Sequence, residues 1–504
     1  MHKRITAGAL IWLTVGQIGQ AQPLDDPAFI AMPRTADELI RISAAIKAPV
    51  DFITPEPFEA KPAGAATVAA RATAGAFAIP AANLLDTSDF VLGQALFNKL
   101  WVAAPASTLA SDGLGPLYNA RSCAGCHAGA GRGHPPFAAG EPSASMIMRV
   151  SVPAAQTEKA GIKAYLATLP DPVYGKQIQT LAIAGHRAEA RVIVDYDEIP
   201  VNLNGGEIIR LRRPTYRLES LGYGKRQSGS MLSARVAPAL IGMGLLDAIP
   251  AADILAAADP KDVNGDGISG RANMVMSVHF GVPTLGRFGL KAGEATLREQ
   301  TASAFSTDMG LSSDLHPDGW GDCTESQASC RTAQDGSTGA GDGREVSTQS
   351  LNLTTLYVAN LGVPARRDIT DSQVLQGKET FYQSGCAACH TPKFVTARLR
   401  GNGPQSFQLI WPFSDLLLHD MGDGLADHRP EALATGREWR TAPLWGIGMT
   451  QTVSGHTLFL HDGRARSLLE AVLWHDGEAK AARDHVIALN VNDRAALIRY
   501  LESL

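Results

Sequence analysis

Cys386-Ala-Ala-Cys389-His390 is the stretch around which the rest of the chain is organised. Two cysteines separated by two residues and followed by histidine form the attachment site of a c-type haem. Each thiol adds to a haem vinyl group, and the histidine becomes an iron ligand. A second copy, Cys123-Ala-Gly-Cys126-His127, lies earlier in the chain. We call these the second and the first haem motif. Together they predict two covalently bound haems, and the histidine after each pair argues against zinc-binding or disulfide pairs.

The composition is that of an ordinary globular protein. The chain has 504 residues, of which 45% are hydrophobic and 19% charged. This length predicts about two to four domains. The net charge of −5 and the pI of about 6.2 give no sign of a nucleic-acid partner.

Residues 1–21 have the pattern of a signal peptide. A basic start, His2-Lys3-Arg4, precedes an apolar run over residues 7–15, and Gly19-Gln20-Ala21 offers small residues for cleavage. The apolar run is short for a membrane span. We therefore expect a protein exported to the periplasm, cleaved near Ala21 and without a membrane span, and c-type haem is attached outside the bacterial cytoplasm.

The two remaining cysteines, Cys323 and Cys330, lie seven residues apart. In an oxidising compartment they predict a local disulfide. A redox-active pair is the alternative, but the wide spacing does not resemble CxxC.

The pattern along the chain predicts a mainly α protein. Residues 22–85 form an Ala/Pro-rich extension. Residues 90–97 and 374–381 read as helices before the two motifs, and both place Gly four residues before Phe. We expect two cytochrome c-like domains, at 86–365 and 366–504, with long structured loops. The alternation over 190–197 and 208–216 predicts a small β insertion in the first.

Asp262, Asn264 and Asp266 begin a stretch that resembles an EF-hand loop. Oxygen side chains at alternate positions followed by Gly267 suit Ca²⁺. Asn273 stands where the loop needs a bidentate Glu. A Ca²⁺ site and an ordinary Asp/Gly turn are therefore both open.

Motifs spread over the chain are similar to those of the di-haem oxidoreductase ("putative peroxidase") family, which is related to the bacterial di-haem cytochrome c peroxidases. The resemblance covers the chain from about residue 85 to the C-terminus. The segments that carry it are RSCAGCH at 121–127, GDGISGR at 265–271, GRFG at 286–289, SDLLLHDMG at 414–422, EWRTAPLWG at 438–446, LHDGRAR at 460–466 and Trp474-His475.

This resemblance implies an iron ligand for the second haem. The peroxidases place a Met at a set distance after an aromatic-His-Asp-Gly segment, and His475 stands at that position here. We expect His390 and His475 to ligate the second iron, which lowers the haem potential relative to Met ligation. Met421 and Met449 are the alternative ligands. Of the other histidines, His419 and His461 are the ones that their motifs place near haem.

The resemblance also implies catalytic groups at the first haem. The peroxidases use a Gln and an acid about ten residues later, and Gln300 and Asp308 occupy these roles here. Cleavage of peroxide needs a proton carrier, which a carboxylate can be. One departure is Leu290, where the peroxidases place a Trp between the haems. Trp445 or Phe288 would have to replace it as an electron relay.

The sequence therefore predicts a di-haem peroxidase that reduces hydrogen peroxide at the first haem. Its electrons would come through the second haem from a periplasmic donor, a small cytochrome or a cupredoxin. Two alternatives stay open: a non-catalytic electron-transfer cytochrome, and an oxidase of an unknown partner substrate. A high-spin band in the spectrum separates the first alternative from the peroxidase.

Overall fold

A computed structural model describes residues 31–137, 141, 145–154, 168–337, 342–401 and 403–504. The predicted signal peptide, residues 1–21, lies outside this part of the chain. The α-helices are α1 Ala36–Ile46, α2 Ser88–Asn98, α3 Cys123–Cys126, α4 Met243–Asp247, α5 Ala251–Leu255, α6 Leu297–Met309, α7 Ala328–Arg331, α8 Thr348–Ala359, α9 Ser372–Gln383, α10 Gly422–Leu425, α11 Thr450–Ser454, α12 Leu468–Leu473, α13 Lys480–Ala488 and α14 Val491–Ser503. The strands are β1 Ala31–Met32, β2 Leu117–Tyr118, β3 Met146–Pro153, β4 Thr168–Leu169, β5 Gln177–Ile178, β6 Leu181–Ala182, β7 Arg191–Asn202, β8 Ile208–Glu219, β9 Met231–Val236, β10 Met274–Met276, β11 Pro283–Leu285, β12 Phe394–Val395, β13 Arg398–Leu399, β14 Leu409–Ile410, β15 Leu418–Asp420 and β16 Glu438–Arg440.

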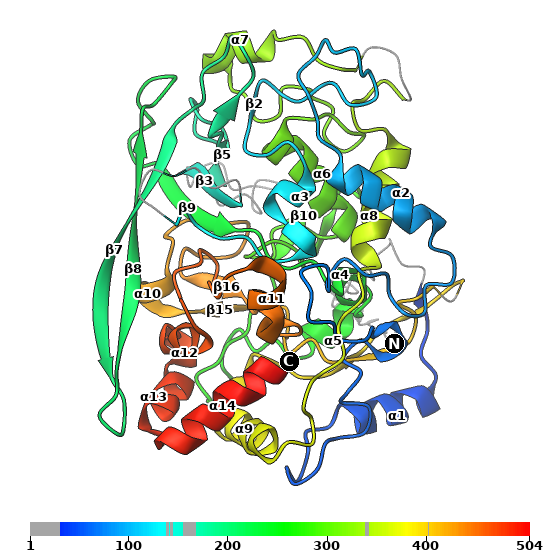
Figure 1. Cartoon of the computed structure of the whole chain (residues 1–504), viewed down its shortest axis with the longest axis vertical. Helices are drawn as coiled ribbons and strands as arrows, with labels where there is room; N and C mark the ends of the chain where they lie inside the picture. Colours follow the sequence, from blue (N-terminus) through cyan, green and yellow to red (C-terminus); the bar gives the residue numbers. More distant parts are fainter. Residues whose placement is uncertain (1–30, 138–140, 142–144, 155–167, 338–341, 402) are drawn as a thin grey trace, which may run out of the picture.

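The helix that precedes each haem motif packs closely against a second helix (Figure 1). α2 packs on α8, and α9 packs on α14. At the first crossing, a Cβ on Gly93 would lie 2.2 Å from the Leu353 carbonyl oxygen. At the second, a Cβ on Gly377 would lie 1.9 Å from that of Ala496. The repeated Gly of the sequence is therefore the residue that lets two helix backbones approach at each crossing.

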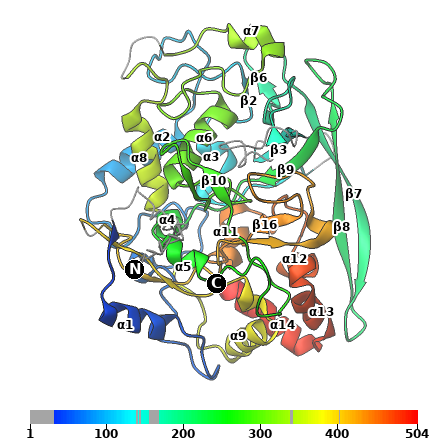
Figure 2. The same cartoon turned by 180° about the vertical axis from the view of Figure 1, so that it is seen from behind.

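The strands form several small sheets and one long ribbon. β3 pairs with β4, β5 and β9. β7 and β8 pair antiparallel over their whole length, from Arg191↔Glu219 to Asn202↔Ile208. Figures 1 and 2 show this ribbon along one side of the molecule, extending toward α13 and α14.

The prediction of a mainly α fold with two cytochrome c-like domains is wrong, whereas the strands expected over 190–197 and 208–216 are present as β7 and β8. Helices account for 29% of the structure and strands for 18%, the strands lie in many small sheets, and the described residues show no pattern of two cytochrome domains. The physical reason lies in long-range packing. One apolar cluster joins Phe97 and Leu245 to Phe394 and Trp445, so it draws on both halves of the chain.

The β7–β8 ribbon ties distant parts of the chain together. At its base, Val194 and Tyr216 pack with the β3–β9 sheet. Near its tip, Leu203 and Leu211 enter the apolar cluster that also contains Trp474. We call this cluster, which includes Phe381, Trp439 and Trp474 and against which Cys386 packs, the second-motif cluster. The ribbon therefore braces the region of the second haem motif.

Candidate haem-binding site

The first haem motif presents a neutral histidine. Ser122 caps α3 by accepting a hydrogen bond from the Gly125 amide, and neither Cys123 nor Cys126 is part of a disulfide. The His127 Nδ1–H donates to the Pro238 carbonyl oxygen at 2.8 Å, so Nε2 is the nitrogen that would bind a metal. Burial lowers the pKa of His127 to about 4, so the ring is in its metal-binding form at neutral pH.

The second haem motif is built in the same way. Gly385 adopts a positive φ of 81° before the turn that holds Cys386 and Cys389, both free thiols. The His390 Nδ1–H donates to the Phe413 carbonyl oxygen at 2.8 Å. Burial lowers the pKa of His390 to about 4. Again Nε2 is the nitrogen left free.

His475 faces His390. It follows α12, and its Nδ1–H donates to the Ala471 carbonyl oxygen at 2.8 Å, so its Nε2 is also free. The two ring centres lie 6.4 Å apart. Two imidazoles on opposite sides of one metal ion place their centres about 6 Å apart, because each metal–nitrogen bond is about 2 Å long. The spacing therefore suits an iron between His390 and His475.

The first motif lacks such a histidine pair. Within the described ranges, no second imidazole lies at a comparable distance from His127. The ring found near it is that of Phe97, with centres 6.5 Å apart. Met449, one alternative ligand, is buried in the apolar cluster that contains Phe97 and Trp445. Cys123 packs against this cluster, which we call the cluster of the first motif. Met421, the other alternative ligand, packs against the second-motif cluster.

Gln300 and Asp308 both lie on α6 but are not brought together. Eight residues separate them, which is about 12 Å along the helix axis. Asp308 is close to the first motif, because its carboxylate, after burial, raises the pKa of the Cys123 thiol. Burial raises the pKa of Asp308 itself. Its Oδ1 accepts a hydrogen bond from the Gln177 Nε2 at 2.7 Å.

Sequence reasoning missed a second acid next to α6. Burial raises the pKa of Glu294 to about 7, and a hydrogen bond from Ser303 on α6 opposes this. The backbone of Glu294 pairs with Phe288, which belongs to the apolar cluster of the first motif. Nothing in the local sequence distinguishes Glu294 from a surface glutamate.

His419 lies beside the second motif. Its Nδ1 is 3.6 Å from the Cys389 Sγ. Its two ring N–H groups donate to Asp415 and Glu478, each at 2.8 Å. Burial lowers the pKa of His419, but the hydrogen bonds to Asp415, Cys389 and Glu478 outweigh it and raise the pKa to about 12. A charged imidazolium between two carboxylates therefore supports the second motif.

This contact predicts acid sensitivity. Burial raises the pKa of Glu478, but hydrogen bonds from His419 and Ser269 outweigh it and lower the pKa to about 2. Since the unfolded pKa is higher, the stabilisation is complete above about pH 4.5 and is lost as pH falls toward 2. We expect a loss on the order of 3 kcal/mol in urea unfolding over this window. Glu478→Gln should remove this pH dependence, whereas Glu325→Gln, at an exposed position, should keep it.

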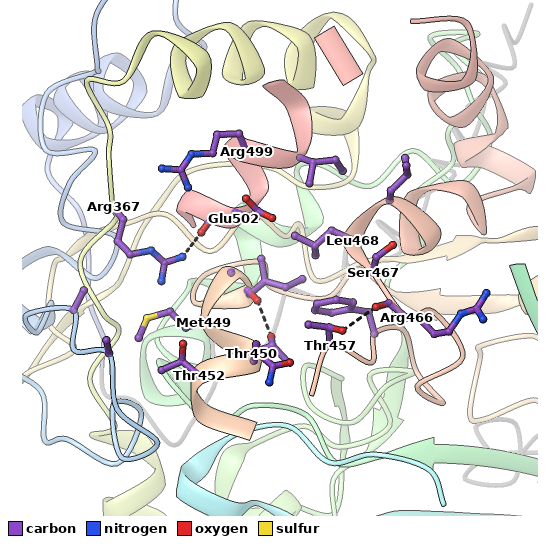
Figure 3. Close-up of a pocket in the computed structure, with 18 of the residues that line it drawn as sticks. Arg367, Met449, Thr450, Thr452, Thr457, Arg466, Ser467, Leu468, Arg499 and Glu502 are labelled. Carbon is purple, nitrogen blue, oxygen red and sulfur yellow. Dashed lines mark hydrogen bonds between the residues drawn. The ribbon is translucent and has the colours of Figure 1, made fainter. Parts of the chain in front are cut away.

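A pocket of about 710 Å³ opens beside the second-motif cluster, between α11, α12 and α14 (Figure 3). Its described lining residues include none of the motif cysteines or histidines, and His475 is not among them. The pocket is therefore distinct from the two haem motifs.

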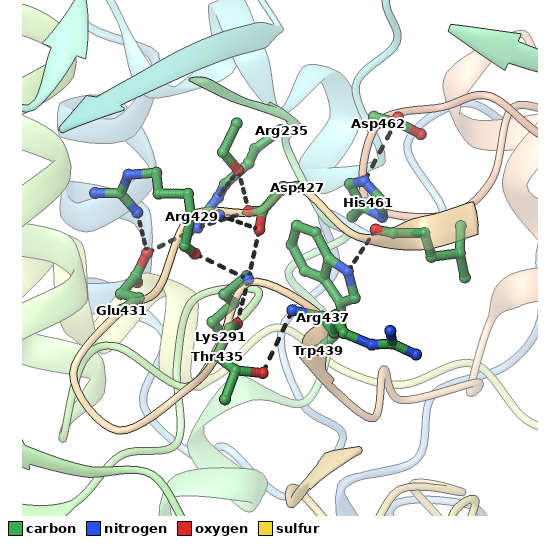
Figure 4. A network of polar contacts seen from close by, with 12 residues as sticks. Arg235, Lys291, Asp427, Arg429, Glu431, Thr435, Arg437, Trp439, His461 and Asp462 are labelled. Atoms are coloured by element: carbon green, nitrogen blue, oxygen red, sulfur yellow. Dashed lines mark hydrogen bonds and ion pairs between the residues drawn. The ribbon is translucent and has the colours of Figure 1, made fainter. Parts of the chain in front are cut away.

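A buried polar network lies next to β15 and β16 (Figure 4). Trp439 is paired with His419 across the two strands. Its ring stacks on His461 at 3.8 Å, and the Lys291 Nζ lies 4.5 Å from its centre. Leu290, the residue at the missing-Trp position, packs against the second-motif cluster. Trp445 and Phe288, in contrast, belong to the cluster of the first motif.

Two further predicted features concern the remaining cysteines and the Asp/Gly loop. Cys323 and Cys330 form a disulfide with their Cα atoms 6.2 Å apart. In the Asp/Gly loop, Asp262 and Asp266 accept hydrogen bonds from loop amides, and Asn264 donates to Asp266. Across the described part of the chain, no group of three or more His, Cys, Asp or Glu side chains is arranged to hold a metal ion. The Ca²⁺ site stays a prediction.

The residues at both motifs fit haem. Each motif offers two cysteines outside any disulfide beside a neutral histidine whose Nδ1 is held by a backbone carbonyl, which defines a protein suited to carry two haems. Residues 58–504 match the model of one family, described as "Di-haem oxidoreductase, putative peroxidase". The chain belongs to this family, which confirms the resemblance noted in the sequence and implies two haems.

The other comparisons add no relatives. Neither the curated proteins nor the solved structures include a significant match to this chain. In the ranges that the structure describes, no helix has both the length and the apolar character needed to cross a membrane.

Proposed function

We propose that this di-haem oxidoreductase is an exported c-type enzyme that reduces hydrogen peroxide at the haem of the first motif. A haem held by the second motif would supply the route for electrons from a periplasmic donor, a small cytochrome or a cupredoxin. The main support is the difference between the two sites. His475 stands opposite His390, whereas His127 has no second imidazole opposite it among the described residues. His390 and His475 would together hold the haem that transfers electrons, and His127 would hold the haem at which peroxide is reduced.

Each group of the chain has a defined task in this proposal. The bound haems supply the redox chemistry. The carbonyl groups of Pro238 and Phe413 hold the two motif histidines in one tautomer and orientation. Asp308 takes a proton from peroxide at one oxygen and returns it at the other. Burial raises the pKa of Asp308, which makes its carboxylate a better proton acceptor, and the Gln177 amide holds that carboxylate in place.

Export and covalent attachment belong to the same proposal. The four cysteines of the two CxxCH motifs are not in a disulfide, whereas Cys323 and Cys330 form one. A structural disulfide is typical of an oxidising compartment. The basic start of the chain and its apolar run agree with a periplasmic location.

Asp308→Asn is expected to slow the reaction with hydrogen peroxide about 100-fold, because a positioned acid–base group contributes at least that factor. The measurement is the rate of the spectral change after stopped-flow mixing with peroxide, starting from the oxidised and from the half-reduced protein. Gln300→Ala is expected to slow it less, since Gln300 lies about 12 Å farther along α6. Asp318→Asn, at an exposed position, is the control.

A second function is favoured by Leu290. A leucine cannot relay an electron, so a pure electron-transfer cytochrome is the rival of the peroxidase. If neither redox form of the wild type reacts with peroxide and both haems remain low-spin, the peroxidase is excluded and the cytochrome stands.

A further inference from the structure

The pocket beside the second-motif cluster has an apolar floor. Ile447, Phe459, Leu468 and Ile498 line it and also belong to, or pack against, that cluster. Its volume of about 710 Å³ is within the usual range of about 300–1,000 Å³ for small-molecule sites. An apolar ring or chain would bury its surface here.

The charges around the pocket are mostly positive. Arginines 71, 367, 466 and 499 line it, against the single carboxylate of Glu502. Two of these arginines form ion pairs within the protein. Arg499 forms an ion pair with Asp368, and Arg466 forms one with Glu470.

The other two arginines, Arg71 and Arg367, form no ion pair with a described residue. Among the described residues, Arg71 has no hydrogen-bond or ion-pair partner, and it is exposed. Arg367 donates to the Glu502 backbone oxygen and forms no ion pair with a described carboxylate (Figure 3). Burial lowers the pKa of Arg367, which a bound anion would reverse.

The backbone brings these two arginines together. Val68 and Pro364 form a parallel bridge, and the Ala365 amide donates to the Val68 carbonyl oxygen. Arg71 and Arg367 each come three residues after one member of this bridge. The two segments therefore start side by side in the same direction, and both Arg71 and Arg367 line the pocket.

We propose that this pocket binds an organic monocarboxylate with an apolar chain or ring. The carboxylate lies between Arg71 and Arg367, where charge-assisted hydrogen bonds hold it. The apolar part covers Ile447, Phe459 and Leu468. The site is independent of the reaction at the first haem.

The test is calorimetric titration of the haem-loaded protein with sodium octanoate, and with octylamine as a probe of equal length and opposite charge. Octanoate should bind with one-to-one stoichiometry, and octylamine should bind at least about tenfold more weakly. Arg71→Gln should weaken octanoate binding about tenfold, the value of one charge-assisted hydrogen bond. Arg499→Gln, on the same rim but paired with Asp368, is the matched control and should change the affinity less than twofold.

A further variant separates the pocket from other surfaces. Thr452→Trp places a large side chain at the pocket lining from an exposed position and should abolish octanoate binding. Absence of octanoate binding at millimolar concentration would overturn the proposal. Equal binding of octylamine, or unchanged octanoate binding in Arg71→Gln, would also overturn it. None of these readouts depends on peroxide, so the two proposals fail separately.

Discussion

His475→Met is expected to raise the reduction potential of the second haem by on the order of 0.1–0.3 V, within the range of about 0.8 V that axial ligands cover. A thioether donates less electron density than an imidazole and therefore favours the reduced iron. His475 lies opposite His390 at the spacing of a metal-bridged pair, so the new side chain would meet the same iron. The measurement is a spectroelectrochemical titration of the purified di-haem protein.

His485→Met is the control for this experiment. His485 lies on α13 and is exposed, and its replacement should leave both potentials unchanged. His475→Gly should lose the low-spin spectrum of the second haem and recover it with added imidazole. An unchanged potential and spectrum in both His475 variants would show that His475 is not the ligand, and Met421 would be tested next.

Lys291→Met is expected to destabilise the protein by about 3–5 kcal/mol, the cost of removing one partner from a buried ion pair. The Lys291 side chain has 0% exposure, and its Nζ donates to the Asp427 carboxylate and to the carbonyl oxygens of Arg429 and Thr435. Without the ammonium group, the 5% exposed Asp427 carboxylate loses its nearest cation. It keeps hydrogen bonds from Ser233 and the Arg429 amide, and the remaining cation, Arg235, is 3.9 Å away. The measurement is the free energy of unfolding in guanidinium chloride.

Lys480→Met is the matched control. Lys480 pairs with Asp484, but both side chains are about half exposed, and such pairs contribute less than about 1 kcal/mol. The double variant Lys291→Met/Asp427→Leu should recover part of the loss, because it removes the isolated charge. A loss below about 1 kcal/mol in Lys291→Met would mean that the ion pair does not stabilise the fold.

The second haem motif is an example of a feature that local sequence predicts. The CxxCH pattern predicts the cysteines and His390 as haem-attachment residues, because attachment chemistry needs these residues at fixed spacing. Helix signals were also local: Asp371 caps α9 and Thr296 caps α6 through side chains that contact their own helix. The repeated Gly before Phe marked the two helix crossings, since only glycine permits such close approach.

The position of His475 needed more than local pattern. The family resemblance suggested it as a ligand. Its distance from His390, which lies 85 residues earlier in the chain, follows from how α12 packs. The β7–β8 ribbon was recognised from its alternation, yet its role as a brace depends on Leu203 and Leu211 reaching the second-motif cluster. Gln300 and Asp308 were predicted to act together. Both lie on α6, but the rise of the helix over eight residues places them far apart.

The sequence by itself determined the family, the two haem motifs and the helices that precede them, because these depend on residues close together in the chain. Only the tertiary structure decided the fold class, the difference between the two sites and the burial of Lys291. Lys291 is separated by 136 residues from Asp427, and in isolation it looks like a surface lysine. Contacts of this kind arise from packing between distant segments, which leaves no periodic or local signal in either one.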